Sequence, residues 1–145
     1  MAGSFFSVGR DGEVVILHPL APGGRIDMPL LTGFDAKPNP VTIKTVTLTG
    51  RHLEDHLPGN YSLTFSNDRS NSILDDFQST LDIAKRSGVA VPTGTVYQYI
   101  RELDGSTSTY QFNEVTFQVT ELGNFKGDDK VTQTLMASAT ERRRM

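Results

Sequence analysis

The segment from Thr93 to Ala139 constrains the fold most, because it is patterned as three successive β-strands joined by short turns. Residues 95–103 are rich in β-branched and aromatic side chains, and Asp104-Gly105 directly after them is a strong hairpin signal. The returning strand alternates apolar and polar residues, but the alternation changes phase at Asn113-Glu114, which predicts a β-bulge. A last strand, rich in Thr, Ser and Ala, is expected over 130–140. The segment therefore predicts an antiparallel meander, and it carries almost no residues suited to catalysis.

One amphipathic helix is predicted just before this segment, at about residues 72–86. Ser72 with Asp75 three positions later resembles a capping box, with Asp in place of the usual Glu. Gly88 suits the left-handed position after a helix, and Pro92 prevents the helix from continuing. Apolar residues at helical spacing define one face: Ile73, Leu74, Phe77, Leu81 and Ala84. This face is expected to pack against a core.

The first half of the chain predicts shorter strands, over 13–18, 30–37, 41–49 and 61–66. Within 41–49 the alternation slips, which favours a bulge or burial on both faces. Residues 50–60 are expected to form a long polar connection. Together these patterns predict a mainly β fold, a small antiparallel β-barrel or sandwich of six or seven strands with the helix flanking it.

Residues 1–145 are expected to form a single domain, because the length suits one hydrophobic core and no linker divides the chain. A formal net charge of −3 argues against a nucleic-acid-binding surface. The absence of cysteine excludes disulfides, thiolate zinc sites and a cysteine nucleophile. No apolar run is long enough for a membrane span, and the N-terminus lacks the features of a signal peptide. Residues 141–145, Glu-Arg-Arg-Arg-Met, are expected to form a short charged tail in solvent.

The polar residues show no pattern of a catalytic or metal-binding site. His52 and His56 stand four apart, as two zinc ligands on a helix would, but no Glu directly follows the first His as the zinc-protease pattern requires. Asp128-Asp129 lacks the further oxygen ligands that a calcium loop supplies. The sequence therefore predicts no enzyme, no metal and no cofactor. The two histidines are expected in a solvated loop, where a neighbouring subunit could touch them.

The order of the elements also resembles a known family. Its early strand is similar to Leu31-Thr-Gly-Phe-Asp-Ala-Lys-Pro-Asn39, and its next block to Tyr61-Ser-Leu-Thr-Phe65 followed by the helix at Ile73-Leu-Asp-Asp-Phe77. The strand, turn and return strand are similar to residues 95–115, and the closing strand to 131–139. The chain thus resembles, over roughly residues 30 to 140, the tail tube proteins of long-tailed bacteriophages, which are related in fold to the tube protein of type VI secretion.

The resemblance implies a β-barrel or sandwich with one flanking helix and a structural function. Subunits of this family form homohexameric rings whose sheets join into an inner barrel, and the rings stack into a tube that conducts DNA. The expected partners are further copies of the chain and the sheath, tape-measure and baseplate or terminator proteins, with DNA only in transit. The expected location is a virion tail with a contractile sheath, assembled in the host cytoplasm.

Two alternatives remain at this point. One is a tail-tube initiator or terminator, or the tube subunit of another contractile injection system. The other is a soluble ligand-binding β-barrel, which requires an enclosed apolar cavity and a stable monomer.

The candidate contacts between stacked rings are the loop from Arg51 to Asn60, the N-terminal segment and the charged tail. The named residues are Arg51, His52, Glu54, Asp55, Arg142 and Arg143. Strands rich in Thr and Ser tolerate one wet face, as the wall of a channel must. The acidic balance of the chain would also keep that wall from holding DNA phosphates.

Overall fold

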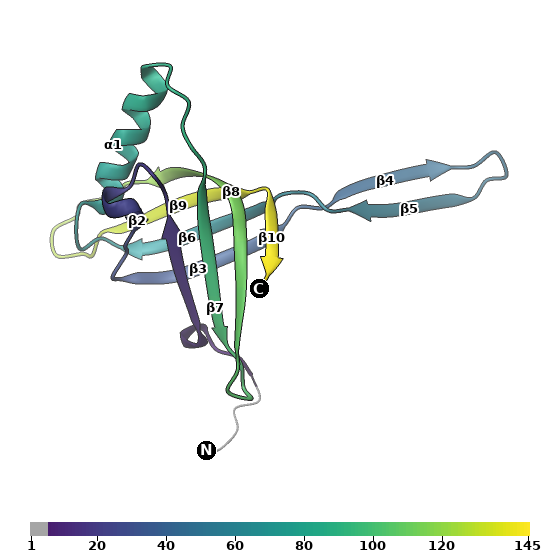
Figure 1. The fold of residues 1–145 in the computed structure, drawn as a ribbon, viewed down its shortest axis with the longest axis horizontal. Coiled ribbons are helices and arrows are strands. Elements are labelled where there is room, and N and C mark those ends of the chain that lie inside the picture. Colours follow the sequence, from purple (N-terminus) through teal and green to yellow (C-terminus); the bar gives the residue numbers. More distant parts are fainter. Residues whose placement is uncertain (1–5) are drawn as a thin grey trace.

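A computed structural model describes residues 6–145 as a strongly bent antiparallel sheet flanked by one α-helix, from which a two-stranded arm extends (Figure 1). The main sheet has the strand order β2-β1-β7-β8-β9-β6-β3, with β10 paired to β8 beside this path. Its strands are β1 (Gly12–Leu17), β2 (Arg25–Ile26), β3 (Leu31–Pro38), β6 (Tyr61–Asp68), β7 (Gly94–Arg101), β8 (Thr107–Glu121), β9 (Thr132–Ala139) and β10 (Glu141–Arg144). The arm consists of β4 (Val41–Val46) and β5 (His52–Leu57), the helix α1 spans Ile73–Arg86, and two 3-10 turns cover Gly9–Asp11 and Pro22–Gly24. The predicted mainly β fold with one flanking helix is confirmed.

The sheet bends in the middle of β8, a 15-residue strand. Glu114 has a φ of 51°, in the left-handed region that residues other than glycine seldom adopt, and the register with β7 shifts opposite this point. The chain that pairs with β8 breaks at the same level, where Thr140 separates β9 from β10 and its N–H donates to the Asn113 carbonyl. The bulge predicted at Asn113-Glu114 is therefore confirmed, and it turns one sheet into two halves that face each other.

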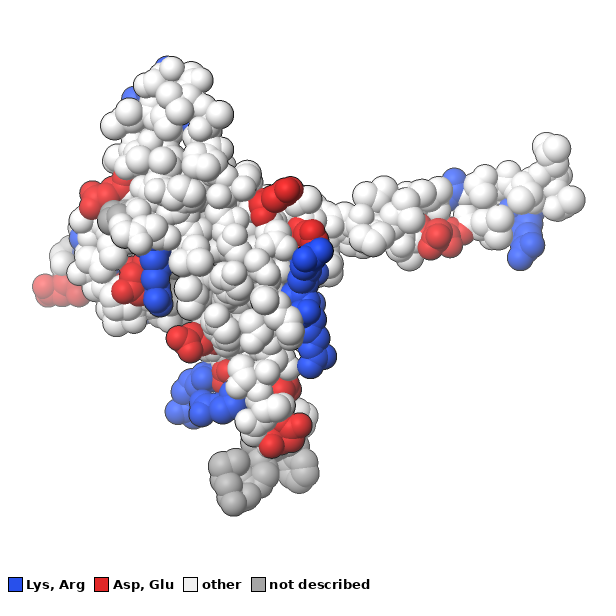
Figure 2. Space-filling view, viewed as in Figure 1, with Lys and Arg blue, Asp and Glu red and all other residues white. Residues whose placement is uncertain are grey.

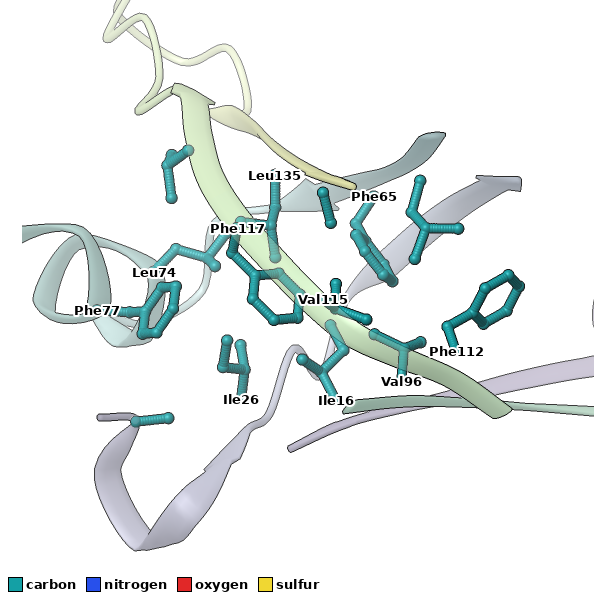
Figure 3. Packing of buried hydrophobic residues seen from close by; sticks show 14 of the residues in the cluster. Ile16, Ile26, Phe65, Leu74, Phe77, Val96, Phe112, Val115, Phe117 and Leu135 are labelled. Atoms are coloured by element: carbon teal, nitrogen blue, oxygen red, sulfur yellow. The ribbon is translucent and has the colours of Figure 1, made fainter. Parts of the chain in front are cut away.

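The core fills the space between the two halves (Figure 3). Phe112, from the half that contains β1 and β7, lies 6.2 Å from the ring centroid of Phe34 on β3 and 6.1 Å from that of Tyr61 on β6. Phe34 in turn packs on Phe65, with the ring centroids 4.9 Å apart. The two contacts of Phe112 are edge-to-face, a geometry that stabilises a core beyond the area it buries. The strand predicted over 61–66 is confirmed as part of β6, and its Leu63 and Phe65 are fully buried.

The helix packs at one end of this core. Leu74, Phe77 and Leu81 are buried, and Gly88 follows the helix with a φ of 74°, as predicted. The predicted capping box is wrong, because the Ser72 side chain caps no backbone N–H and its hydroxyl donates to the Asp76 carboxylate instead.

Asp75 has a different partner set. Its carboxylate accepts hydrogen bonds from the Arg69 guanidinium, at 2.9 and 3.1 Å, and from the buried Gln133 amide at 2.8 Å. Gln133 also donates to the Leu122 carbonyl. A charge-assisted network therefore fixes the start of α1 to β9.

The helix also covers one strand edge. The main-chain N–H of Val119 lies on β8 beyond the end of β7, and it donates to the Gln78 side chain of α1 at 3.1 Å. Gln78 is held by a second hydrogen bond to Asp82. Since open strand edges invite further pairing, α1 removes this part of β8 from the edges available to another chain.

The charged C-terminus at 141–145 is exposed, as expected, but it is ordered against the sheet as a strand, which the sequence did not predict. Glu141–Arg144 form β10, paired with β8 from Asn113 to Tyr110. Arg142 lies on the core side of this pair, with its guanidinium carbon 3.8 Å from the centroid of the Tyr110 ring. β10 is stabilised because the aliphatic stem and the charge of Arg142 pack on an aromatic ring. The sequence pattern alone did not reveal this contact.

His18 joins four parts of the fold. Its ring is 2% exposed and packs edge-to-face on Phe77 of α1 and Phe117 of β8. The Leu20 N–H donates to its Nδ1 at 3.1 Å, and the ring has a further hydrogen bond to the backbone of Pro92. Burial lowers the pKa of His18 below its ordinary value of 6.5, and the bond to Pro92 opposes this only in part. His18 is therefore a neutral, hydrogen-bonded side chain that connects α1 to the sheet.

Replacing Arg142 by Ala should destabilise β10, because the cation–π contact with Tyr110 is lost. We expect a loss of about 0.5–1 kcal/mol in the free energy of unfolding and faster amide exchange over residues 141–144. Arg143→Ala is the matched control, since Arg143 pairs only with Glu141 on the outer side. Equal losses in both variants, measured by urea unfolding, would show that the Tyr110 contact does not hold the strand.

Protonation of His18 should couple folding to pH. Since the folded-state pKa is lowered, the unfolded chain binds the proton more readily, so stability falls as the pH drops below 6.5. Urea midpoints between about pH 7.5 and 5 should decline in the native chain and decline less in His18→Gln. His52→Gln, at an exposed position, is the control. An identical decline in the His18 variant would exclude this residue as the cause.

Candidate assembly surfaces

The arm is the part of the molecule that departs most from the sequence prediction. β4 and β5 pair without a register shift from Val41 opposite Leu57 to Val46 opposite His52. The turn between them closes with Thr47 N–H donating to the Arg51 carbonyl, and Gly50 adopts a φ of 84°. The predicted polar connection at 50–60 is therefore wrong, because most of it forms β5. The bulge or two-sided burial predicted within 41–49 is also wrong, since every residue of β4 is exposed.

The two faces of the arm differ in chemistry. One face, which we call the apolar arm face, carries four aliphatic side chains that remain 40–53% exposed: Val41, Ile43, Leu53 and Leu57. Thr45 and Asp55 complete this face. The opposite face carries Thr42, Lys44, Val46, His52, Glu54 and His56. A period of two along both strands places these sets on opposite sides.

The root of the arm is closely packed. Pro38 ends β3, Pro40 and Pro58 flank the arm, and the Asn39 N–H donates to the Asn60 carbonyl at 2.9 Å. Gly59 lies directly against the Asn39 carbonyl and leaves no room for a side chain. The prolines cannot donate to the ladder, so regular pairing stops here and restarts in the arm. The arm consequently leaves the body as a separate ribbon (Figure 1).

The candidate contact residues fall on three separate surfaces. Arg51 lies at the turn of the arm and His52 on its polar face. Glu54 and Asp55, which were predicted together, point to opposite faces, and Glu54 lies 3.8 Å from His56. The structure does not bring them together with Arg142 and Arg143, which lie on β10, where basic side chains gather in Figure 2. The N-terminal segment that was also predicted includes residues 1–5, which lie outside the described part of the chain.

Two open faces of the main sheet were not assigned to particular residues from the sequence. On the half with β1 and β7, the rings of Tyr97 and Tyr99 stack with centroids 6.4 Å apart. Val15 lies opposite Tyr97, and Leu17 lies one pair further along the same face. We call this the tyrosine face. The alternation of the two tyrosines with the buried Val96 was visible in the sequence. The pattern did not show that the side of the strand with the tyrosines would stay uncovered.

The other open face belongs to β3, β6, β9 and β8. Its inner side carries the buried Leu63, Phe65 and Leu135, so its outer side carries the alternate residues. Hydroxyl groups are frequent among these residues: Ser62, Thr64, Ser66, Thr116, Thr132, Thr134 and Ser138. We call this the hydroxyl face. The alternation of inward and outward residues along each strand could have identified the hydroxyl face, but only with the strand order known.

We find no arrangement typical of a catalytic or metal site among the described residues. Within residues 6–145, no three His, Asp or Glu side chains come together as metal ligands. Surface hollows lie beside the loop at Gly123 and Lys126 and beside the turn at Asp104 and Ser106, and polar groups contribute to both linings. The Asp104 carboxylate accepts hydrogen bonds from the main-chain N–H and the hydroxyl of Ser106, which close the β7–β8 turn. These hydrogen bonds lower the pKa of the Asp104 carboxyl. No helix in this range has the length and apolar character needed to cross a membrane.

Comparison with models of protein families and with curated proteins gave no match. Solved structures do match over nearly the whole chain. The anti-feeding prophage cap, a tube-terminating cap, is 10% identical with a TM-score of 0.62 over 100% of this chain and 94% of its own. The sheath/tube terminator of the extracellular contractile injection system PVC is 11% identical, with a TM-score of 0.60 over 100% and 99%.

A chain of the extended PVC sheath-tube complex is 10% identical, with a TM-score of 0.57 over 92% of this chain and 88% of its own. At such low identity the likeness establishes the fold. The chain therefore has the fold found in tube, terminator and cap assemblies of contractile injection systems, and the predicted resemblance to the tail tube family is confirmed at that level.

Proposed function

We propose that the chain is a non-enzymatic structural subunit that forms homohexameric rings, which stack into the tube of a contractile tail or injection particle. The apolar arm face is the observation that carries this proposal. A two-stranded ribbon is marginally stable in water, and this one projects four exposed aliphatic side chains. Burying the rest of their surface would contribute on the order of 1–2 kcal/mol each. A second copy of the chain supplies the covering surface in a tube.

The strand edges support self-assembly as well. β3 ends the strand order of the main sheet, and β10 pairs with β8 alone within residues 6–145. Both edges leave main-chain donors and acceptors that another subunit can satisfy by extending the sheet. α1 covers the part of β8 that extends beyond β7, so the edges that the described residues leave for contacts within a ring are β3, β10 and the end of the sheet formed by β2 and β1.

The proposed partners follow from the assembly. A sheath surrounds the tube, tape-measure and baseplate or terminator proteins set its length and ends, and DNA passes through the channel. We place assembly in the host cytoplasm and the finished subunit in the tail. The contacts between rings include Arg51, His52, Glu54 and Asp55 of the arm.

A role at the end of the tube is the second candidate. The cap and terminator structures match this chain at least as well as the sheath-tube chain does, with TM-scores of 0.62 and 0.60 against 0.57. An initiator or terminator would form a single ring on a preformed end and would not extend into rods.

Electron microscopy of the purified chain, alone and with a tail initiator, separates these candidates. Stacked rods with sixfold rings support the tube subunit, and rings that never stack support the end role. Monomers under all of these conditions would overturn both.

Replacing Ile43 and Leu53 together by Ser should abolish or shorten the tubes, because the apolar arm face loses half of its aliphatic side chains. The body should keep its stability, since these residues lie on an exposed ribbon. Val46→Ser, on the opposite face of the same arm, is the matched comparison and should weaken assembly less than the double variant does. Normal tube length in the double variant, measured by electron microscopy, would remove the apolar arm face from the contacts.

Asp55→Lys and Glu54→Lys should be compared separately, since the two carboxylates face opposite sides. Asp55→Lys places a cation on the face that docks, so it should weaken stacking more than Glu54→Lys does. Tube growth unchanged by either substitution would exclude this part of the arm from contacts between rings.

A further inference from the structure

The half of the sheet that carries the tyrosine face ends in two open strand edges. One of them is β10. At the other, the first part of β1, residues 12–15, has no strand partner within residues 6–145 on the side away from β7, because β2 pairs only with Ile16 and Leu17. The two edges lie on opposite sides of β7 and β8 (Figure 1). Each can accept a strand from another chain.

The strand directions allow one copy of the chain to continue the sheet of another. β1, β7, β8 and β10 are antiparallel neighbours in that order, so β10 runs opposite to β1. A second copy in the same orientation therefore presents its β10 antiparallel to β1 of the first. A head-to-tail contact of this kind joins two different surfaces and can repeat from copy to copy.

The main chain of β10 leaves alternate residues free. The Met145 N–H donates to the main chain of β8, and in an antiparallel ladder every second residue makes such bonds. Arg143 is bonded to β8 in the same way, whereas the N–H and C=O groups of Arg142 and Arg144 point away from β8. The side chains of these two arginines stand on the core side of the sheet, near the Tyr110 ring, and not along this edge.

The same alternation applies to β1. The His18 N–H donates to the main chain just before β2, which fixes the phase of this edge. Val14 and Gly12, at even steps from His18, therefore direct their main-chain groups to the same side, where β2 no longer reaches. The Gly12 N–H is already bonded to the Gly9 carbonyl. Val14 consequently offers a donor and an acceptor, and Gly12 offers an acceptor.

One register satisfies all of these groups. In it, Arg142 of one copy exchanges two hydrogen bonds with Val14 of the next, and the Arg144 N–H donates to the Gly12 carbonyl. A shift by two residues in one direction is blocked because Ile16 already pairs with β2, and in the other direction by the 3-10 turn that precedes β1. A shift by one residue would exchange the inner and outer faces.

This register also brings opposite charges together. Between the two hydrogen-bonded pairs it places Arg143 opposite Glu13 on the outer side of the sheet, in the non-hydrogen-bonded position where side chains lie closest. Both side chains are exposed, and Glu13 forms no ion pair within residues 6–145. Arg143 pairs with Glu141 of its own chain, which would lie opposite the uncharged Val15. Opposite charges directly across a ladder stabilise it.

We propose that β10 of one copy adds to the free edge of β1 in the next, with Arg143 opposite Glu13, so that the half-sheets carrying the tyrosine faces join head to tail. This inference rests on the proposed self-assembly and names one junction within it. Two copies of β10 suit each other poorly, because their arginines would meet across the ladder. The edge of β1 supplies a carboxylate instead.

Disulfide formation tests the junction, because the native chain contains no cysteine. Opposite residues in a non-hydrogen-bonded pair have Cα atoms about 4.5 Å apart, within the reach of a disulfide. Within one chain Glu13 and Arg143 are separated by three strand spacings, about 14 Å, which is beyond that reach. Mixed assemblies of Glu13→Cys and Arg143→Cys should therefore form a disulfide between copies, and neither variant alone should. Arg143→Cys mixed with Ser79→Cys, exposed on α1, is the control.

Charge reversal tests the contact between the two side chains. Glu13→Arg should raise the concentration at which the chain sediments as assemblies by about two- to fivefold, because like charges then meet across the junction. Adding Arg143→Glu restores opposite charges and should return this concentration toward the native value. Glu121→Arg, which reverses an exposed carboxylate at the end of β8, is the matched control and should change it less.

The outcomes separate this junction from the function on which it rests. Assemblies that form normally but crosslink no more than the Ser79 control would overturn the junction and leave the proposed tube standing. A double charge reversal that assembles no better than Glu13→Arg alone would overturn the register. A chain that never assembles, alone or with a tail initiator, would overturn both the junction and the tube.

Discussion

The left-handed bend at Glu114 is the constraint on which the other surfaces depend. Without it, β8 would run straight for 15 residues and its neighbours would form one flat sheet with a single apolar side exposed. The bend lets Phe112 reach Phe34 and Tyr61 from the other half, so that the apolar sides of both halves close on each other. Backbone strain of about 1–3 kcal/mol at one residue is small beside the burial that it permits.

Closing the halves fixes the outer faces at the same time. Since strand residues alternate between two sides, inward placement of Val96 leaves Tyr97 outside, and inward placement of Phe117 leaves Thr116 and Gln118 outside. The helix then seals the end of the core and the open edge of upper β8, through Phe77 and Gln78. What remains uncovered in residues 6–145 is a tyrosine face, a hydroxyl face, the strand edges at β3, β10 and β1–β2, and the arm.

The sequence identified the elements that local chemistry defines. The helix, the Asp104-Gly105 turn and the bulge were predictable because apolar spacing, turn residues and changes of phase are signals that lie within a few residues of each other. The arm was missed because β5, His52 to Leu57, is polar and has low intrinsic strand preference, and it becomes a strand through pairing with the Val- and Thr-rich β4. β10 was missed for a similar reason, since Arg142 is held by a ring 32 positions earlier in the chain, at Tyr110. Candidate residues on the arm and tail were therefore named correctly as surface groups, but the faces they occupy required the strand register.

The arm carries apolar surface that the rest of the described chain leaves uncovered. Within residues 6–145 its residues pair only with each other, and its root is fixed by prolines and by Gly59 against the Asn39 carbonyl. A fixed root means that little conformational entropy is lost when the arm docks, so most of the free energy from burying Val41, Ile43, Leu53 and Leu57 remains available for association. A ribbon that is rigid in direction and apolar on one side is poorly suited to a solitary protein and well suited to a repeating one. Burial of this face against a second copy would stabilise an assembly, and that is the physical basis of the proposed tube.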